Sequence, residues 1–132
     1  MAQAEPAARP LSPHMQIWRW HITMLTSILH RATGIILYVG VIGLVVWLAA
    51  LAAGPDVYSP MMALIPGWAI EAKVYLITTV LAFHLANGVR HFAFDVGAGF
   101  KPKTADATAW LALLFAFAAP VGLAALVHLV RR

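Results

Sequence analysis

The sequence contains no cysteine, and only 11% of its 132 residues are charged. Without thiols the chain cannot form a disulfide or hold an iron–sulphur cluster or a thiolate zinc site. A soluble domain of this size covers its surface with far more charge, whereas 62% of these residues are hydrophobic. The composition therefore indicates a protein of the lipid bilayer. The six histidines are the ligands left for any metal.

Acidic residues are the scarcest charged type, and the net charge is +4. In a membrane protein an excess of Lys and Arg is usually a topology signal. No basic run is interleaved with aromatic residues, so we expect no nucleic-acid partner. The sequence has no internal repeat, and no acidic residue lies deep within an apolar segment, which argues against a transporter.

The first 16 residues lack the apolar core of a secretory signal and the serine and arginine richness of a transit peptide. We therefore expect a multi-pass protein of a bacterial inner membrane. Residues 1–20 are predicted to form a polar, cytoplasmic N-terminal segment. Its end, Trp18-Arg19-Trp20, suits the headgroup region of a bilayer.

Three segments are long and apolar enough to cross a bilayer core of about 30 Å, which takes about 20 helical residues. The second is interrupted by Lys73 and Arg90, which we expect to snorkel or to pair inside the protein. The sequence thus predicts an all-α membrane protein, with a transmembrane domain at residues 21–132 and spans at about 28–53, 67–94 and 107–130. Loops are expected at 54–67 and 95–106.

Basic residues gather before the first span and around the second loop. The positive-inside rule therefore places the N-terminus and that loop in the cytoplasm, and the C-terminus on the outer side. The terminal Arg131-Arg132 pair is the exception.

Polar groups near the first span form one candidate site. Ser27, His30, Arg31 and Gly34 share one helix face because their spacing is i, i+3, i+4, i+7. Together they could bind an oxygen-rich ligand, such as a quinone carbonyl, a haem propionate or a lipid phosphate. The alternative is a snorkelling arginine with a serine at the start of the helix. The three polar groups on one face favour a site.

A second candidate site lies in the second span, where His84, Gly88 and His91 share a face. A neutral imidazole in an apolar span is a natural axial ligand for haem iron, and Gly88 leaves room for a flat ligand or a close helix. The alternative is a histidine that pairs with a neighbouring helix.

Two histidines of one helix face cannot bind one iron from opposite sides, since seven residues separate His84 and His91 by about 10 Å. His30 and His128 are the other candidates within the chain. We expect His30 to lie nearer the depth of His91, and His128 near the outer end of the third span. A second axial ligand would then come from a partner chain.

The sequence resembles the family of succinate dehydrogenase cytochrome b subunits, the larger of the two membrane anchors of that complex. The order and spacing of three motifs carry the resemblance: RPLSPHMQI at residues 9–17, SILHRATG at 27–34, and His84-x-x-x-Gly88-x-Arg90-His91-x-x-x-Asp95.

The resemblance implies three transmembrane helices beside a second small anchor subunit, with iron–sulphur and flavoprotein subunits on the cytoplasmic side. It implies one haem b shared between the anchors, with His84 as an axial ligand. It places Ser27 and Arg31 in the ubiquinone site, and His30, Arg31 and His91 near the haem propionates. Asn87 departs from its apolar neighbours, and we expect it to contact the partner anchor.

The function predicted on this basis is that of an anchor subunit of succinate:ubiquinone oxidoreductase, which is not catalytic alone. Ser27 would hydrogen-bond a quinone oxygen, and Arg31 would stabilise the negative charge that develops there. One alternative is the anchor of a quinol:fumarate reductase. The other is a haem-free structural subunit or a small transporter.

Overall fold

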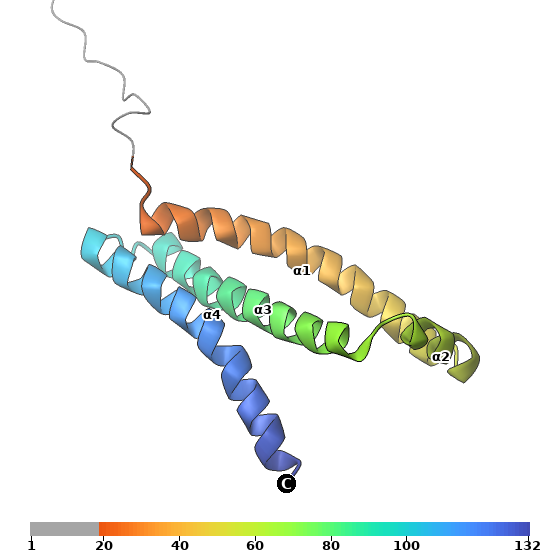
Figure 1. Ribbon diagram of the computed structural model, residues 1–132. Helices are drawn as coiled ribbons and strands as arrows, with labels where there is room; N and C mark the ends of the chain where they lie inside the picture. The colour runs from red at the N-terminus through yellow and green to blue at the C-terminus, as the bar shows by residue number, and fades with distance from the viewer. Residues whose placement is uncertain (1–18) are drawn as a thin grey trace, which may run out of the picture.

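The computed structural model describes residues 19–132, and within that range all regular secondary structure is helical (Figure 1). The helices are α1 (Ile22–Ala52), α2 (Pro55–Ala63), α3 (Gly67–Asp95) and α4 (Pro102–Val130). The segment predicted at 1–20 falls almost wholly outside the described residues, as does the motif at 9–17, so the domain division stays a prediction.

Three helices, α1, α3 and α4, are long and apolar enough to cross a membrane, which confirms the all-α membrane fold with three spans. Each has 29 to 31 residues and is therefore about 45 Å long. Such helices exceed the hydrocarbon thickness, so their ends reach the headgroup regions or the helices tilt.

The first span begins earlier than the sequence predicted, because α1 starts at Ile22. Ser27 and His30 consequently lie inside the helix rather than at its start. A single charged residue such as Arg31 does not end a helix when its long side chain can reach polar surroundings.

The segment predicted as a loop at 54–67 is partly helical in the structure, since it contains α2. Gly54 adopts a φ of 97°, which a residue with a side chain rarely takes, and it ends the run of α1. Pro55 then occupies the first helical position, where its missing N–H costs nothing.

The connection between α3 and α4 depends on two glycines and a proline. Gly97 and Gly99 have φ angles of 81° and 83°, and Pro102 starts α4. The turn is therefore shorter than the predicted 95–106, and it brings the start of α4 back beside the end of α3.

The start of α1, the end of α3 and the start of α4 meet at one end of the molecule, while α2 lies at the other (Figure 1). Small residues on α4, namely Ala109, Ala112 and Ala116, are buried and allow a close approach. Pro120 lies inside α4, where it removes one backbone donor. The C-terminal part of α4 diverges from α3 (Figure 1).

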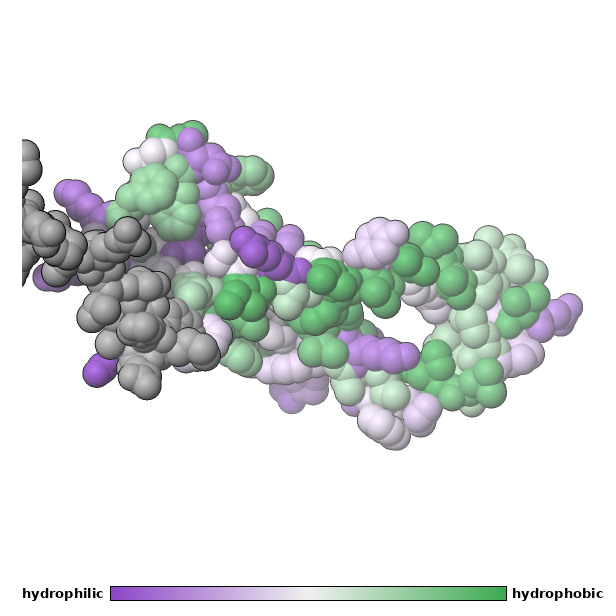
Figure 2. Space-filling model, turned by 90° about the horizontal axis from the view of Figure 1, so that it is seen from above, coloured by the Kyte–Doolittle hydropathy of each residue, from purple (hydrophilic) through white to green (hydrophobic). Residues whose placement is uncertain are grey.

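Large hydrophobic side chains are exposed along all three long helices. Figure 2 shows hydrophobic residues over much of the visible face, with hydrophilic residues more frequent toward the end where α1 starts. In a bilayer these side chains contact lipid or another membrane subunit.

Candidate functional site

A buried polar layer joins α1 to α3. Thr26 and Asn87 are fully buried, and Arg90 is only 6% exposed. The Asn87 Nδ2 group donates to the Thr26 carbonyl over 3.2 Å. Arg90 Nη1 donates to Thr26 Oγ1 and to Asn87 Oδ1, each over 3.3 Å. Hydrogen bonds therefore link these three residues to one another across α1 and α3.

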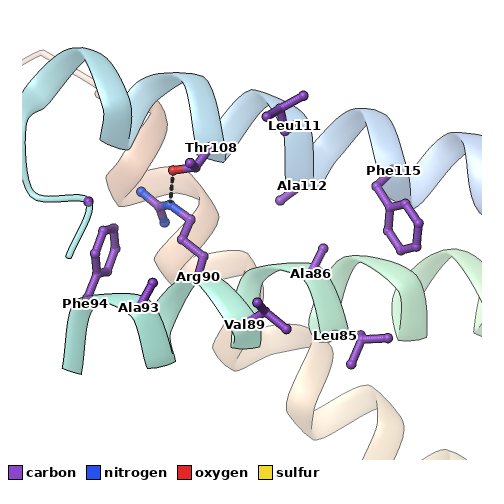
Figure 3. A pocket seen from close by; sticks show the side chains of 11 residues that line it. Leu85, Ala86, Val89, Arg90, Ala93, Phe94, Thr108, Leu111, Ala112 and Phe115 are labelled. Atoms are coloured by element: carbon purple, nitrogen blue, oxygen red, sulfur yellow. Dashed lines mark hydrogen bonds between the residues drawn. The ribbon is translucent and has the colours of Figure 1, made fainter. Parts of the chain in front are cut away.

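The same arginine reaches across to α4 (Figure 3). Arg90 Nε donates to Thr108 Oγ1 over 3.0 Å, and Nη2 donates to the Ala105 carbonyl over 3.1 Å. The guanidinium carbon lies 4.6 Å from the centre of the Phe94 ring, a cation–π distance. Arg90 thus ties all three spanning helices together near one end of the bundle.

Two predictions about α3 are settled by this layer. Arg90 pairs inside the protein, as expected, whereas Lys73 is exposed. The expectation that Asn87 contacts a partner anchor is wrong, because its side chain is fully buried within this chain. From the sequence Asn87 looked like a lone polar residue, since its partner Thr26 lies 61 positions away.

A histidine cluster lies next to the polar layer, between α1 and α3. The rings of His30 and His84 are stacked, with centroids 4.0 Å apart and planes inclined by 14°. The His91 ring lies 5.0 Å from that of His30, at an inclination of 44°. The structure therefore brings together the three histidines that the two predicted sites had divided.

The His30 ring is not placed beside His91 alone, because its centroid lies 4.0 Å from that of His84 and 5.0 Å from that of His91. The physical reason is the register of the two helices. A Cβ at Gly88 would lie 3.7 Å from His30 Cε1, so His30 packs over the residue midway between the other two histidines. The missing side chain at Gly88 gives this ring its place.

The stacked arrangement also argues against His30 as the second ligand of an iron bound by His84. Axial imidazoles point their nitrogens at the iron from opposite faces of the porphyrin, and two rings stacked face to face cannot do so. His128, the other candidate, is exposed near the far end of α4. No group of three or more potential ligands within residues 19–132 is arranged to hold a metal ion by itself.

Two residues of α1 hold the His84 ring: Thr33, which the sequence did not single out, and Gly34, which it placed in the first candidate site. Thr33, 8% exposed, places its Oγ1 atom 3.1 Å from His84 Nδ1. A Cβ at Gly34 would lie 3.2 Å from His84 Cε1, so this glycine, rather than Gly88, makes room for His84. The available signal was a small polar residue beside a glycine, one turn after His30.

The remaining predicted site residues lie on α1. Ser27 is half-buried and Arg31 is exposed, and both are within one helical turn of His30. Arg31 is thus free to reach the surroundings of the bundle, while Ser27 lies partly between helices.

The donors present in the cluster fit a bound haem. His84 is half-buried, with one nitrogen engaged by Thr33 and the other not hydrogen-bonded within the described chain. His30 Nδ1 is buried and has no hydrogen-bond partner among residues 19–132. An imidazole ligand and a nearby unused polar nitrogen are the groups that an iron and a propionate require.

A pocket of about 530 Å³ lies on the α3–α4 side of Arg90 (Figure 3). Its walls are apolar, formed by residues such as Leu85, Val89 and Phe115, and Arg90 and Thr108 lie at its polar end. The pocket is separate from the histidine cluster, which lies between α1 and α3.

Three helices able to span a membrane, tied together by Arg90 and carrying a histidine cluster between α1 and α3, define a polytopic membrane protein. Residues 5–123 match the model of the succinate dehydrogenase/fumarate reductase transmembrane subunit family. The chain belongs to this family.

Individual relatives agree with the family match. The chain is 36% identical to the succinate dehydrogenase cytochrome b556 subunit of Rickettsia bellii over 104 residues, covering 77% of this chain and 79% of the relative. It is 32% identical to the cytochrome b556 subunit of Paracoccus denitrificans over 110 residues, covering 80% and 81%. It is 36% identical to the mitochondrial cytochrome b560 subunit of Sus scrofa over 135 residues, covering 89% and 71%.

Proposed function

We propose that this chain is the anchor subunit of a succinate:ubiquinone oxidoreductase, where it binds one haem b and forms part of the quinone-reduction site. The observation that carries the proposal is that the His84 ring is fixed in place by its contact with Thr33 and by stacking on His30. Relatives named as cytochrome b subunits support it.

His84 would hold the haem iron, with the other axial ligand supplied by a second small anchor subunit. The stacking of His30 on His84 supports the external ligand, because it removes the nearest internal candidate. The buried Nδ1 of His30, together with Arg31 and His91, would bind the propionates. The haem, when bound, supplies a one-electron carrier within the membrane.

Ser27 and Arg31 would form this chain's part of the quinone site. The Ser27 hydroxyl would donate to a quinone carbonyl, and the Arg31 guanidinium would stabilise negative charge as that oxygen is reduced. Electrons would arrive from an iron–sulphur subunit fed by a flavoprotein, since this chain has no cysteine to hold a cluster.

The orientation follows from the distribution of basic residues. Arg19, Lys101 and Lys103 lie at the end where α1 starts and α3 turns into α4 (Figure 1). The positive-inside rule makes that end cytoplasmic, in a bacterial inner membrane, and the C-terminus external. The soluble subunits would then contact this end, close to Ser27 and Arg31.

A haem measurement tests the first part of the proposal. The complex is purified in mild detergent through a tag on this chain, and its Soret band is compared among wild type, His84→Ala and His128→Ala. His84→Ala should abolish or shift the band, whereas the exposed His128 serves as a matched control. An unchanged band in His84→Ala would move the ligand elsewhere, and a wild-type complex without any band would favour a haem-free structural subunit.

A kinetic measurement tests the quinone site. Ser27→Ala should lower succinate-dependent ubiquinone reduction by about tenfold or more, while electron transfer from succinate to a soluble artificial acceptor stays unchanged. Ser59→Ala is the control, because Ser59 is exposed on α2 at the opposite end. Normal ubiquinone kinetics in Ser27→Ala would refute the role of this serine.

A quinol:fumarate reductase is the second candidate, because the matched family includes the fumarate reductase subunit. The same site would serve the reverse reaction. Fumarate reduction by menaquinol that is faster than succinate-dependent ubiquinone reduction, in the same preparation, would favour this alternative.

A further inference from the structure

We propose that Thr33 is a positioning residue that fixes the tautomer of His84, so that the Nε2 atom carries the lone pair offered to the iron. This inference rests on the proposed function, in which His84 binds haem. It is drawn from two hydrogen bonds of one hydroxyl group.

The Thr33 hydroxyl has a single hydrogen to donate. We assign that hydrogen to the carbonyl oxygen of His30, one turn earlier in α1, because this contact is the shorter of the two, 2.9 Å against 3.1 Å. The 3.1 Å contact between Thr33 Oγ1 and His84 Nδ1 must then be a bond in which the ring nitrogen donates. A neutral imidazole with its proton on Nδ1 has its lone pair on Nε2.

The surroundings of the ring keep it in this position. Thr33 is buried, so water does not compete for its hydroxyl. Gly34 closes one side, since even a methyl group there would come within 3.2 Å of His84 Cε1. The His30 ring covers a face of His84 at a centroid distance of 4.0 Å. One hydrogen bond and two packing contacts from α1 therefore set the direction in which His84 Nε2 points.

A hydrogen bond from Nδ1 makes an imidazole a stronger donor to a metal. It favours ferric over ferrous iron, so its loss should raise the haem reduction potential. A tenfold loss of that preference corresponds to a rise of about 59 mV for a one-electron couple.

The test uses the whole complex carrying Thr33→Val, which keeps the shape of the side chain and removes the hydroxyl. Thr33→Ser restores the hydroxyl. Thr79→Val is the matched control. The Thr79 hydroxyl on α3 donates to the Tyr75 carbonyl of its own helix, as the Thr33 hydroxyl donates to the His30 carbonyl. Redox titration of the haem band and electron paramagnetic resonance of the ferric haem are measured for each complex.

The expected result is a raised potential and an altered ferric spectrum in Thr33→Val, wild-type values in Thr33→Ser, and no change in Thr79→Val. Wild-type potential and spectrum in Thr33→Val would overturn the proposal. An assembly defect in both Thr33→Val and the smaller Thr33→Ala would also overturn it, because the hydroxyl would then serve helix packing. Loss of haem in His84→Ala, measured in parallel, separates a failure of this inference from a failure of the haem assignment.

Discussion

The imidazole rings of His30 and His84 stack at a centroid distance of 4.0 Å, although the two residues lie on different helices. The contact requires that α1 and α3 approach closely at this level. Gly34 faces His84 and Gly88 faces His30, so each ring lies over a residue without a side chain. A side chain at Gly34 would have less room than one at Gly88, because its Cβ would lie 3.2 Å rather than 3.7 Å from the facing ring.

Gly34→Ala should disturb the haem site. The new Cβ would lie 3.2 Å from His84 Cε1, closer than ordinary contact, so the ring must move. Overpacking of this kind costs about 1–3 kcal/mol, only partly offset by a helix-propensity gain of about 1 kcal/mol. We expect a reduced haem content or a shifted haem spectrum in the purified complex.

Gly88→Ala is the matched control for this substitution. Its Cβ would lie 3.7 Å from His30 Cε1, an ordinary van der Waals distance. Stability should be unchanged or raised by up to about 1 kcal/mol, because alanine favours the helix. Equal haem spectra in the two variants would contradict the contact that the structure assigns to Gly34.

Arg90→Gln should destabilise the bundle. The arginine donates hydrogen bonds to groups on α1, α3 and α4, and glutamine can replace only part of them. Bonds to a charged group contribute about 1.5–3 kcal/mol each, and the two N–H donors of glutamine leave at least two of the four bonds unmade, so the loss should be about 3–6 kcal/mol. This loss of stability is measured by thermal denaturation of the detergent-solubilised complex, with subunit dissociation as the readout.

Lys73→Gln provides the comparison for Arg90, since it removes the same charge from an exposed position on the same helix. Its midpoint temperature should stay close to that of wild type. If both variants lost the same stability, net charge rather than the buried network would account for the effect.

Asn87→Leu should cost about 1–3 kcal/mol, because it removes a bond to the Thr26 carbonyl and leaves one Arg90 donor unpaired. Asn87→Asp should cost less, since a carboxylate still accepts from Arg90. The same thermal measurement applies, with Thr78→Val as a control on an α3 hydroxyl that bonds only its own helix. A stability order in which Asn87→Asp is worse than Asn87→Leu would contradict the pairing with Arg90.

Gly99→Ala should weaken the turn between α3 and α4. Gly99 has a φ of 83°, and a Cβ there would lie 3.2 Å from Phe94 Cε1. The left-handed backbone alone costs a residue with a side chain about 1–2 kcal/mol. Gly122→Ala, in a helix with nothing within 4 Å of the new Cβ, should be neutral or stabilising. Thermal stability of the two complexes decides the prediction.

The sequence predicted the three spans because hydrophobic runs of sufficient length need no knowledge of their neighbours. It also singled out His30, His84 and His91 as candidate site residues, since ionisable residues in apolar helices are costly and call for a role. It misplaced the start of α1 and missed α2, because absence of charge does not define where a helix begins and a proline-rich loop can still contain a helical turn.

What the sequence determined by itself was thus the membrane, the number of spans and the residue types available to a cofactor. Tertiary structure alone decided which of these residues meet. The register of α1 against α3 places His30 on His84, Thr33 at its Nδ1 atom and Asn87 inside the chain. That register is set by glycines and by a buried arginine whose partners lie on three helices, and such long-range pairing leaves no periodic trace in a single sequence.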